Sequence, residues 1–463
     1  MSSFAGLNTA LSALRYNRVA MDVASGNIAN VNTEGYTRRT VNAASVGAPS
    51  QPAMWSRYSG AGDGVQVSSI DRMSDMLLDV RARREHGNQS YLDIRQSVLE
   101  RVESGIGEPG DSGVAAAIAD FRTAWHDLAN NPGSDAARSA VLGRAATLAD
   151  AIKVQARNID SESGDQRVRI QADVAEVNTV ASDLAATNKS IAVANLNGTD
   201  AGVLLDKRDQ LAMRLSELTG ATATGRADGG FDVSVNGVPL VVGSKAGTLE
   251  IASGITAAGA SDGTPISYQI TDTGGTTAVP PGMLGEIGGV TDLLTTTLPA
   301  YTAGLDAIAQ QLADEINTQH QAGYDKNGNP GQPLFTYTPG SAASSITVAL
   351  TAPADLAASG IPGGGLDASN ATALSTATGV EASYQRLING FGTEVASVTR
   401  LAANQQVLTS QVDGSREQLS GVNLDEETVS MLASQHAYEA ASRVLTTLDS
   451  VLDTLINRTG VTR

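Results

Sequence analysis

The chain has no cysteine, few aromatic residues and no excess of basic residues, and each absence removes a class of function. Without cysteine among its 463 residues, it forms no disulfide, no cysteine-ligated zinc site and no thiol nucleophile. Aromatic residues make up only 4% of the chain, unlike a compact enzyme interior rich in large side chains. The formal net charge of −18 argues against nucleic acid as a partner, because phosphate-binding surfaces need clustered lysine and arginine.

Long apolar runs are also absent. No stretch reaches the ~18 consecutive apolar residues that indicate a transmembrane helix. The first residues, MSSFAGLNTALSALRYN, lack the basic region and continuous apolar run that are typical of a Sec-type signal peptide. We therefore expect no membrane span, and we expect any export to use machinery that recognises a different signal.

Motifs for metal or phosphate chemistry are weak throughout. None of the four histidines forms an H-E-x-x-H pair, and the glycines of SGAGDGVQVSSI lead into a predicted strand without the lysine of a P-loop. The segment GYDKNGNPGQPLF begins like a calcium loop at Asp325, but it has Pro330 at the glycine position and Thr336 at the glutamate position. A turn explains this segment better. The sequence predicts no catalytic residues, no metal and no cofactor.

Both ends of the chain carry apolar residues at helical spacing. Near the start, one helix face is formed by Leu7, Leu11, Leu14 and Met21. Near the end, a heptad seam is formed by Met431, Tyr438, Leu445, Leu448, Leu452 and Leu455. Asn423 is placed to cap this second helix, and Glu426 to reach back as in a capping box. Asp425, Glu426 and Glu427 are interpreted as ordinary acids of the first turn. The alternative is a metal or catalytic carboxylate cluster, but no histidine lies at ligand spacing nearby.

The middle of the sequence changes from helical to β-rich and back. Helical patterns extend to about residue 220, with a break at NNPG (residues 130–133) before a capping Ser134. Residues 221–364 are rich in glycine, threonine and proline. In FDVSVNGVPLVV, the dipeptide Asn236-Gly237 predicts a type I′ hairpin. Two further strands are predicted, PISYQIT and SSITVAL. One helix is predicted among them, LPAYTAGLDAIAQQLADEINTQHQ. The helical pattern resumes at about Ala382.

We therefore predict a mainly α protein with a β-rich insertion. Residues 1–40 and 420–463 would form a terminal helical domain, and residues 41–220 and 365–419 a helical-bundle rod. Residues 221–364 would form a β-rich domain that projects outward from the rod.

Asparagines cluster where the first helix should end, in SGNIANVNTEGYTRR. Asn27 and Asn30 share one helix face, and Asn32 begins a turn in which Gly35 is available for a positive φ. One interpretation is that these amides cap the helix end. The other is that buried amides fix the register of packed helices, as a single asparagine does in coiled coils. The sequence leaves both interpretations open.

The terminal apolar stripes need a partner. They could pair with each other as antiparallel helices in one monomer, or neighbouring subunits of a polymer could complete them. On the second interpretation, the predicted assembly interface consists of Leu7, Leu11, Leu14, Met21, Asn27, Asn30, Asn32, Gly35, Met431, Tyr438, Leu445, Leu448, Leu452 and Leu455.

Several stretches resemble a known family. SGNIANVNTEGYTRR is similar to the N-terminal signature of bacterial flagellar rod, hook and hook-associated proteins, with Glu34 where the family usually has proline. SGVNLDEETVSMLASQHAYEAASRVLTTLDSVLDTLI resembles the matching C-terminal signature, with Ser434 and His436 where phenylalanine and glutamine are more usual. The form SGVNLDEE is typical of the FlgK family of hook-associated proteins. Four further stretches also resemble motifs of this family: LANNPGSDAARSAVLGRA, LLDKRDQLAMRLSEL, GYDKNGNPGQPLF and GAGDGVQVSSIDR.

This resemblance implies a structural subunit of the flagellum that joins hook to filament and is needed for filament assembly, and it implies no enzymatic activity. The implied partners are other copies in a lateral ring, the hook subunit, a second hook-associated junction protein, and an export chaperone on the C-terminal helix. Export through the flagellar type III channel would place the protein outside the cell. A hook or other axial subunit stays open as an alternative, as does a secreted adhesin or enzyme that uses residues 221–364.

Overall fold

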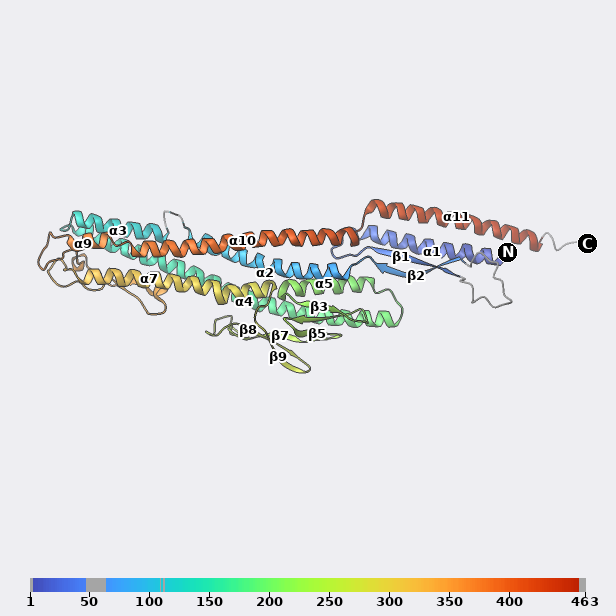
Figure 1. Cartoon of the computed structure of the whole chain (residues 1–463), viewed down its shortest axis with the longest axis horizontal. Helices are drawn as coiled ribbons and strands as arrows, with labels where there is room; N and C mark the ends of the chain where they lie inside the picture. The colour runs from blue at the N-terminus through green and yellow to red at the C-terminus, as the bar shows by residue number, and fades with distance from the viewer. Residues whose placement is uncertain (1–2, 47–63, 109, 111–112, 458–463) are drawn as a thin grey trace, which may run out of the picture.

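The computed structural model describes residues 3–46, 64–108, 110 and 113–457, and it is an elongated rod (Figure 1). Both chain ends lie at the same end of the rod. There, α1 (Ser3–Ala29) and α11 (Leu424–Asn457) run antiparallel to each other. They pack closely enough that a Cβ atom added to Gly6 would lie 3.4 Å from Leu448 Cδ1. A hairpin of β1 (Arg39–Val46) and β2 (Gly64–Arg72) lies beside α1.

A bundle of long helices forms the rest of the rod. Its main members are α2 (Met76–Ile106), α3 (Val114–Asn130), α4 (Asp135–Leu196), α5 (Gly202–Thr219), α7 (Leu298–Gln321) and α10 (Gly379–Ser420). α4 has 62 residues and is therefore about 90 Å long. Shorter elements are α6 (Gly285–Asp292), a π-helical segment (Leu293–Thr297), α8 (Ala342–Ser345), a 3-10 turn (Pro353–Asp355) and α9 (Ser369–Ser375).

Local side chains set where these helices begin. The predicted break before Ser134 separates α3 from α4, and Ser134 Oγ accepts the backbone N–H of Ala137 at 3.2 Å. The carboxylate of Asp75 accepts the N–H groups of Leu77 and Leu78 at the start of α2. The polar residues before each helix thus satisfy N–H groups that have no partner within the helix.

Two small antiparallel sheets lie along the bundle. One has the order β3-β4-β5-β6, from β3 (Thr222–Gly225), β4 (Phe231–Val235), β5 (Val238–Val242) and β6 (Lys245–Ala246). The other contains β7 (Thr248–Ser253), β8 (Ser267–Asp272) and β9 (Gly275–Val279). The predicted turn between β4 and β5 is confirmed, because Asn236 and Gly237 have φ angles of 49° and 87°, as a type I′ turn requires.

Side-chain amides of α4 attach both sheets to the bundle. Asn188 Oδ1 accepts the N–H of Phe231, and its Nδ2 donates to the carbonyls of Phe231 and Gly243. Asn178 bonds the backbone of Leu249 in the same way. Its Oδ1 accepts the N–H of Leu249 at 2.7 Å, and its Nδ2 donates to the carbonyl of Leu249 at 3.0 Å. Each amide therefore acts as a short extension of a sheet edge, and the sheets are fastened to one face of the long helix.

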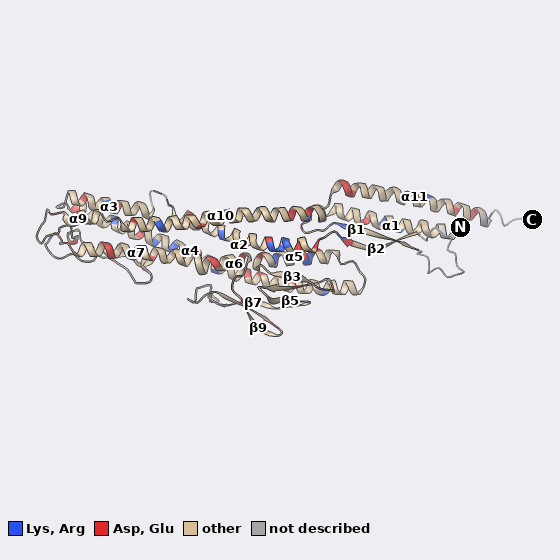
Figure 2. Ribbon diagram, viewed as in Figure 1, with Lys and Arg blue, Asp and Glu red and all other residues tan. Residues whose placement is uncertain are grey.

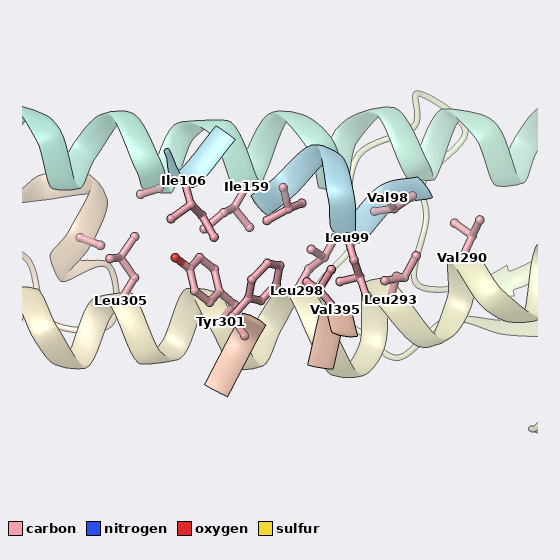
Figure 3. Packing of buried hydrophobic residues seen from close by; sticks show 14 of the residues in the cluster. Val98, Leu99, Ile106, Ile159, Val290, Leu293, Leu298, Tyr301, Leu305 and Val395 are labelled. Atoms are coloured by element: carbon pink, nitrogen blue, oxygen red, sulfur yellow. The ribbon is translucent and has the colours of Figure 1, made fainter. Parts of the chain in front are cut away.

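The helices share one apolar core (Figure 3). Leu99 of α2, Ile159 of α4, Tyr301 of α7 and Val395 of α10 are all almost completely buried. The rings of Tyr301 and Phe391 lie 4.9 Å apart. Burial of each such side chain contributes about 2 kcal/mol, so packing between helices stabilises the rod. The prediction of a mainly α protein with a β-rich insertion is confirmed.

One predicted strand is much shorter than expected. SSITVAL forms only β11 (Thr347–Val348), which pairs with β10 (Phe335–Thr336). The preceding residues form α8 because Asp306 of α7 accepts the N–H of Ala343 at 2.7 Å and so fixes a helical turn there. A contact with another helix therefore overrides the strand pattern.

Asp173 of α4 gives the stability of the rod an unusual pH dependence. Burial raises its pKa to about 6, and the negative charge of Glu286 adds to the rise. Because the folded state binds this proton more tightly than the unfolded state, the stabilisation from protonation is complete below about pH 4 and is lost between about pH 4 and 6. Asp173→Asn should therefore raise the free energy of unfolding at pH 7.5 by about 2 kcal/mol.

Urea denaturation at a series of pH values checks this prediction. The gain from Asp173→Asn should vanish below about pH 4, where Asp173 is already neutral. Asp183→Asn is the matched control, because Asp183 is an exposed residue of the same helix and should change little. Equal stability of Asp173→Asn and the parent at pH 7.5 would contradict the prediction.

Candidate assembly joint at the base of the terminal helices

Segments far apart in the sequence meet where the terminal helices join the bundle. The loop after α1, the ends of β1 and β2, the start of α5 and the start of α11 all reach this place. Charged residues are dense in the neighbouring parts of α2, α5 and α10 (Figure 2). We call this region the joint. Two clusters of polar side chains hold it together.

The first cluster is built on Asn27, which is completely buried near the end of α1. Its Nδ2 donates to the carbonyl of Arg39 and to Glu427 Oε2, both at 2.9 Å. Its Oδ1 accepts the N–H of Arg39 at 3.0 Å and the hydroxyl of Tyr36 at 2.8 Å. One amide therefore ties α1 to the start of β1 and to the first turn of α11.

Glu427 is the partner that links the two ends of the chain. It is only 3% exposed, and its Oε1 accepts Arg38 Nε at 2.7 Å. Glu427 is an acid of the first turn of α11, as predicted, but it is buried and paired. The predicted capping box is wrong for Glu426, because its side chain pairs with Arg38 at 3.0 Å. Asn423 caps α11, because its Oδ1 accepts the backbone N–H groups of Asp425 and Glu426.

The second cluster fastens the β1–β2 hairpin to α5. Arg39 and Arg72 lie opposite each other in the hairpin register. Arg72 pairs with Asp206 and Asp209, both at 2.7 Å, and Arg39 pairs with Asp206 at 3.3 Å. The two aspartates are three residues apart and so share a face of α5. Burial opposes the charge of Arg72, but the two carboxylates outweigh it and raise its pKa above the ordinary value.

Smaller contacts close the joint around a polar hollow. Gln210 Nε2 donates to the carbonyl of Glu34 at 2.5 Å, directly beside Gly35. Gly35 has a φ of 73°, and a Cβ there would lie 2.1 Å from Gln210 Nε2, so this position requires glycine. Arg416 of α10 pairs with Asp79 of α2 at 2.9 Å. The hollow between these elements has a volume of about 490 Å³.

The remaining asparagines of the opening cluster have local roles. Asn30 Nδ2 donates to the carbonyl of Gly26, one turn back, and Asn32 is exposed on the turn. Of the three amides, only Asn27 is buried. Contacts at the helix end thus account for Asn30, whereas Asn27 fixes how α1 meets α11.

Most of the apolar residues of the predicted assembly interface are half-buried in the structure. Leu448 lies beside Gly6, and the half-buried members of the set are Leu7, Leu14, Met21, Met431, Leu445, Leu448 and Leu452. Leu11 and Tyr438 are 39% and 37% exposed. The side chain of Leu455 lies outside the described residues.

The structure supports the turn interpretation of the calcium-like segment. Asp325 Oδ1 accepts the N–H groups of Asn327 and Asn329, both at 2.8 Å, so this carboxylate already holds the turn. Within the described residues, no group of three or more acidic or histidine side chains is arranged to hold a metal ion. No described helix is long and apolar enough to cross a membrane.

Two further features resemble parts of active sites but have structural roles. The sequence GASDG (residues 259–263) has the spacing of a nucleophile elbow, but Ser261 forms an isolated antiparallel bridge with Ile255 and no helix follows it. Its hydroxyl accepts the N–H of Gly263. His320 is buried, and burial lowers its pKa to about 4. Its ring contacts the carbonyl of Gln332 and accepts the N–H of Ala357, which joins two loops to α7.

Comparison with known proteins decides the family. The family model "Flagellar hook-associated protein FlgK helical domain" matches residues 99–335. The chain belongs to the FlgK family of flagellar hook-associated proteins. Models of a flagella basal body rod protein and of the flagellar basal body rod FlgEFG protein C-terminal region match residues 7–37 and 417–458. At the joint, Asn27 of the first matched region bonds Glu427 of the last. Arg39, whose backbone bonds Asn27, pairs with Asp206 of the central region.

FlgK-family relatives match over nearly the whole chain. Flagellar hook-associated protein 1 of Bacillus subtilis (strain 168) is 28% identical over 505 residues, covering 99% of each chain. Its namesake in Escherichia coli (strain K12) is 25% identical, covering 97% of this chain and 99% of that one. The flagellar hook junction protein FlgK from Burkholderia pseudomallei has the same fold, with a TM-score of 0.64 at 17% identity over 73% of this chain and all of that one.

This membership makes the chain a structural, axial subunit of the bacterial flagellum at the junction of hook and filament. The residues of the joint that sequence reasoning missed are Arg38, Arg39, Arg72, Asp206, Asp209 and Glu427. A signal for them existed, because YTRR, SSIDR, LLDKRD and NLDEE all lie in stretches that resemble the family. Nothing local showed which arginine meets which acid.

Asn27→Ala should weaken the joint selectively. It leaves the buried Glu427 without one donor and the backbone of Arg39 without its partners, at a cost of about 3 kcal/mol in the free energy of unfolding. Hydrogen exchange should accelerate at residues 36–40 and at the start of α11. Asn32→Ala, at an exposed position in the same loop, is the control. Unchanged exchange in both segments would show that Asn27 does not hold them.

Proposed function

We propose that this FlgK-family protein is required to assemble the filament on the hook, and that its terminal helices pack against those of neighbouring copies. Support comes from α11. The outer stripe, which we define as Val429, Leu432, Val444 and Val451, is 66%, 46%, 52% and 46% exposed. With His436 and Ala440 between them, these residues follow helical spacing on the side of α11 away from the α1-facing seam. A monomer leaves such a stripe uncovered, whereas a polymer would bury it.

This proposal revises the role of the predicted interface residues. The seam on α11 and its partners on α1 would hold the two helices of one copy together. The outer stripe, with exposed Leu11 on α1, would hold adjacent copies together. A contact that is repeated between copies builds a regular assembly only if the terminal helices meet the bundle at the same angle in every copy. The joint fixes this angle. Asn27 joins the two terminal helices to each other, and Arg72 connects the hairpin beside them to α5 of the bundle.

The proposed organisation follows the elements. Residues 1–40 and 420–463 would form the terminal domain, residues 41–220 and 365–419 the rod, and residues 221–364 the outward β-rich domain. We propose a lateral ring of copies between the hook subunit and a second hook-associated junction protein, outside the cell. Because the outer stripe is apolar, it needs a cover before assembly, which supports an export chaperone on α11 and passage through the type III channel. We propose no catalytic activity.

Deletion of the gene tests the function as a whole. Cells examined by electron microscopy should carry hooks without filaments and should shed flagellin monomers into the medium. Missing hooks would instead place the protein in the hook or rod. Complete flagella in a strain without a second copy of the gene would contradict the proposal.

Val444→Asp tests the outer stripe. Because Val444 is 52% exposed, the monomer should fold normally, but a buried carboxylate between copies should reduce flagellated cells at least tenfold. Circular dichroism of the purified monomer and filament counts provide the two measurements. Gln435→Asp is the control, because it adds the same charge to an exposed position of α11 outside both stripes. Normal filament numbers with Val444→Asp would exclude the outer stripe as the contact.

A further inference from the structure

An apolar hollow of about 500 Å³ lies between the sheet β7–β8–β9 and the helices of the bundle. Its principal lining residues are Tyr91, Tyr268, Pro280, Pro281, Met283 and Thr295. Pro280, Pro281 and Thr295 are exposed at its rim. This volume lies in the range of pockets that bind ligands or partner side chains.

The walls of the hollow are held in place without any occupant. Tyr91 OH donates to Asp292 at 3.3 Å, and Tyr268 OH lies 2.6 Å from the hydroxyl of Thr291. Asn236, in the β4–β5 turn, donates to the carbonyls of Pro280 and Pro281 at 2.9 and 3.1 Å. A preformed site loses little conformational entropy on binding, so modest apolar contacts there are effective.

The chain also has an apolar projection that fits such a hollow. At the turn between α4 and α5, Val193, Leu196 and Val203 are 49%, 87% and 68% exposed. We call these three residues the α4–α5 corner. Lys189, seven residues before Leu196, shares their side of α4 and makes no ion pair with a described carboxylate.

We propose that the α4–α5 corner of one copy inserts Leu196 into the apolar hollow of a neighbouring copy. This inference rests on the proposed function, in which copies lie side by side. The projection and the hollow lie on different parts of one chain, so the contact is heterologous: each copy gives its corner to one neighbour and its hollow to another. Contacts of this type build rings or helices.

Charge favours the same pairing. Asp292, which lines the hollow, pairs with Arg95 at 3.2 Å, and Arg95 also pairs with Glu394 at 2.8 Å, so this group carries a net negative charge. Lys189 would approach it when Leu196 is inserted. The attraction between the two groups favours this orientation over those that bring acid to acid.

The contact also sets an offset between copies. Asp173 of α4 faces Tyr268, which lines the hollow, whereas Leu196 lies 23 residues further along the same helix. At 1.5 Å per residue, neighbouring copies would be displaced by about 35 Å along the rod. Parallel copies joined in this way would follow a helical path, so the proposed lateral ring would be a turn of a helix.

Paired cysteines test the contact, because the natural chain has none that would interfere. Cells whose only copy carries both Leu196→Cys and Thr295→Cys should yield flagella in which a short bismaleimide links this chain into dimers and higher multimers. Each single variant should give no multimers. Leu366→Cys with Thr295→Cys is the control, because Leu366 is a similarly exposed leucine, at 81%, at the far end of the rod.

The possible results separate this contact from the proposed function. Flagella that contain the Leu196/Thr295 variant but show no linked multimers would overturn the contact and leave the proposed function intact. Absence of the parent chain from purified flagella would overturn both. Leu196→Ser gives a second measurement: the monomer should keep its stability, because the residue is exposed, while flagellated cells should fall about tenfold. An unchanged number of flagellated cells would contradict the contact.

Discussion

The arrangement of this molecule depends on a hydrogen bond between residues 400 positions apart, from the buried amide of Asn27 to Glu427. The amide also holds both backbone groups of Arg39, so it fixes the end of α1, the start of the hairpin and the start of α11 together. Unpaired polar groups at this depth are costly, and this cost enforces a single arrangement. A chain that leaves along one set of helices and returns along another needs such a closure.

Side-chain amides bond backbone groups in the same way elsewhere in the molecule. Asn178 and Asn188 of α4 pair with strand backbone just as Asn27 pairs with Arg39. The arginine–aspartate cluster on α5 adds charge to this scheme and is shielded from solvent, with Arg72 and Asp206 only 10% and 11% exposed. The rod is thus built by apolar packing along its length, whereas polar contacts set the angles at which its parts meet. Those angles are what a subunit between two different polymers has to control.

Local pattern predicted the elements better than their partners. The spacing of LPAYTAGLDAIAQQLADEINTQHQ matches α7 from its first residue to its last, and Asn236-Gly237 specified its turn. These signals lie within a few residues of their effect. The pairing of Arg72 with Asp206 spans 134 positions, and nothing near either residue identifies the other. For the same reason, periodicity revealed an apolar seam on α11 but left open whether α1 of the same chain or a neighbouring copy covers it. The outer stripe became visible only from the exposure of its residues in the structure.

The lateral attachment of the sheets to α4 has a consequence for variation within the family. Because side-chain amides hold only a few backbone groups of the strands, the tips of the hairpins are free to lengthen or shorten without altering the helices beneath. The alignments with the Bacillus subtilis and Escherichia coli proteins extend over 505 and 553 positions against the 463 residues of this chain, so insertions or deletions separate this chain from both relatives. We therefore expect insertions and deletions to be tolerated at the tips of these hairpins better than within the long helices.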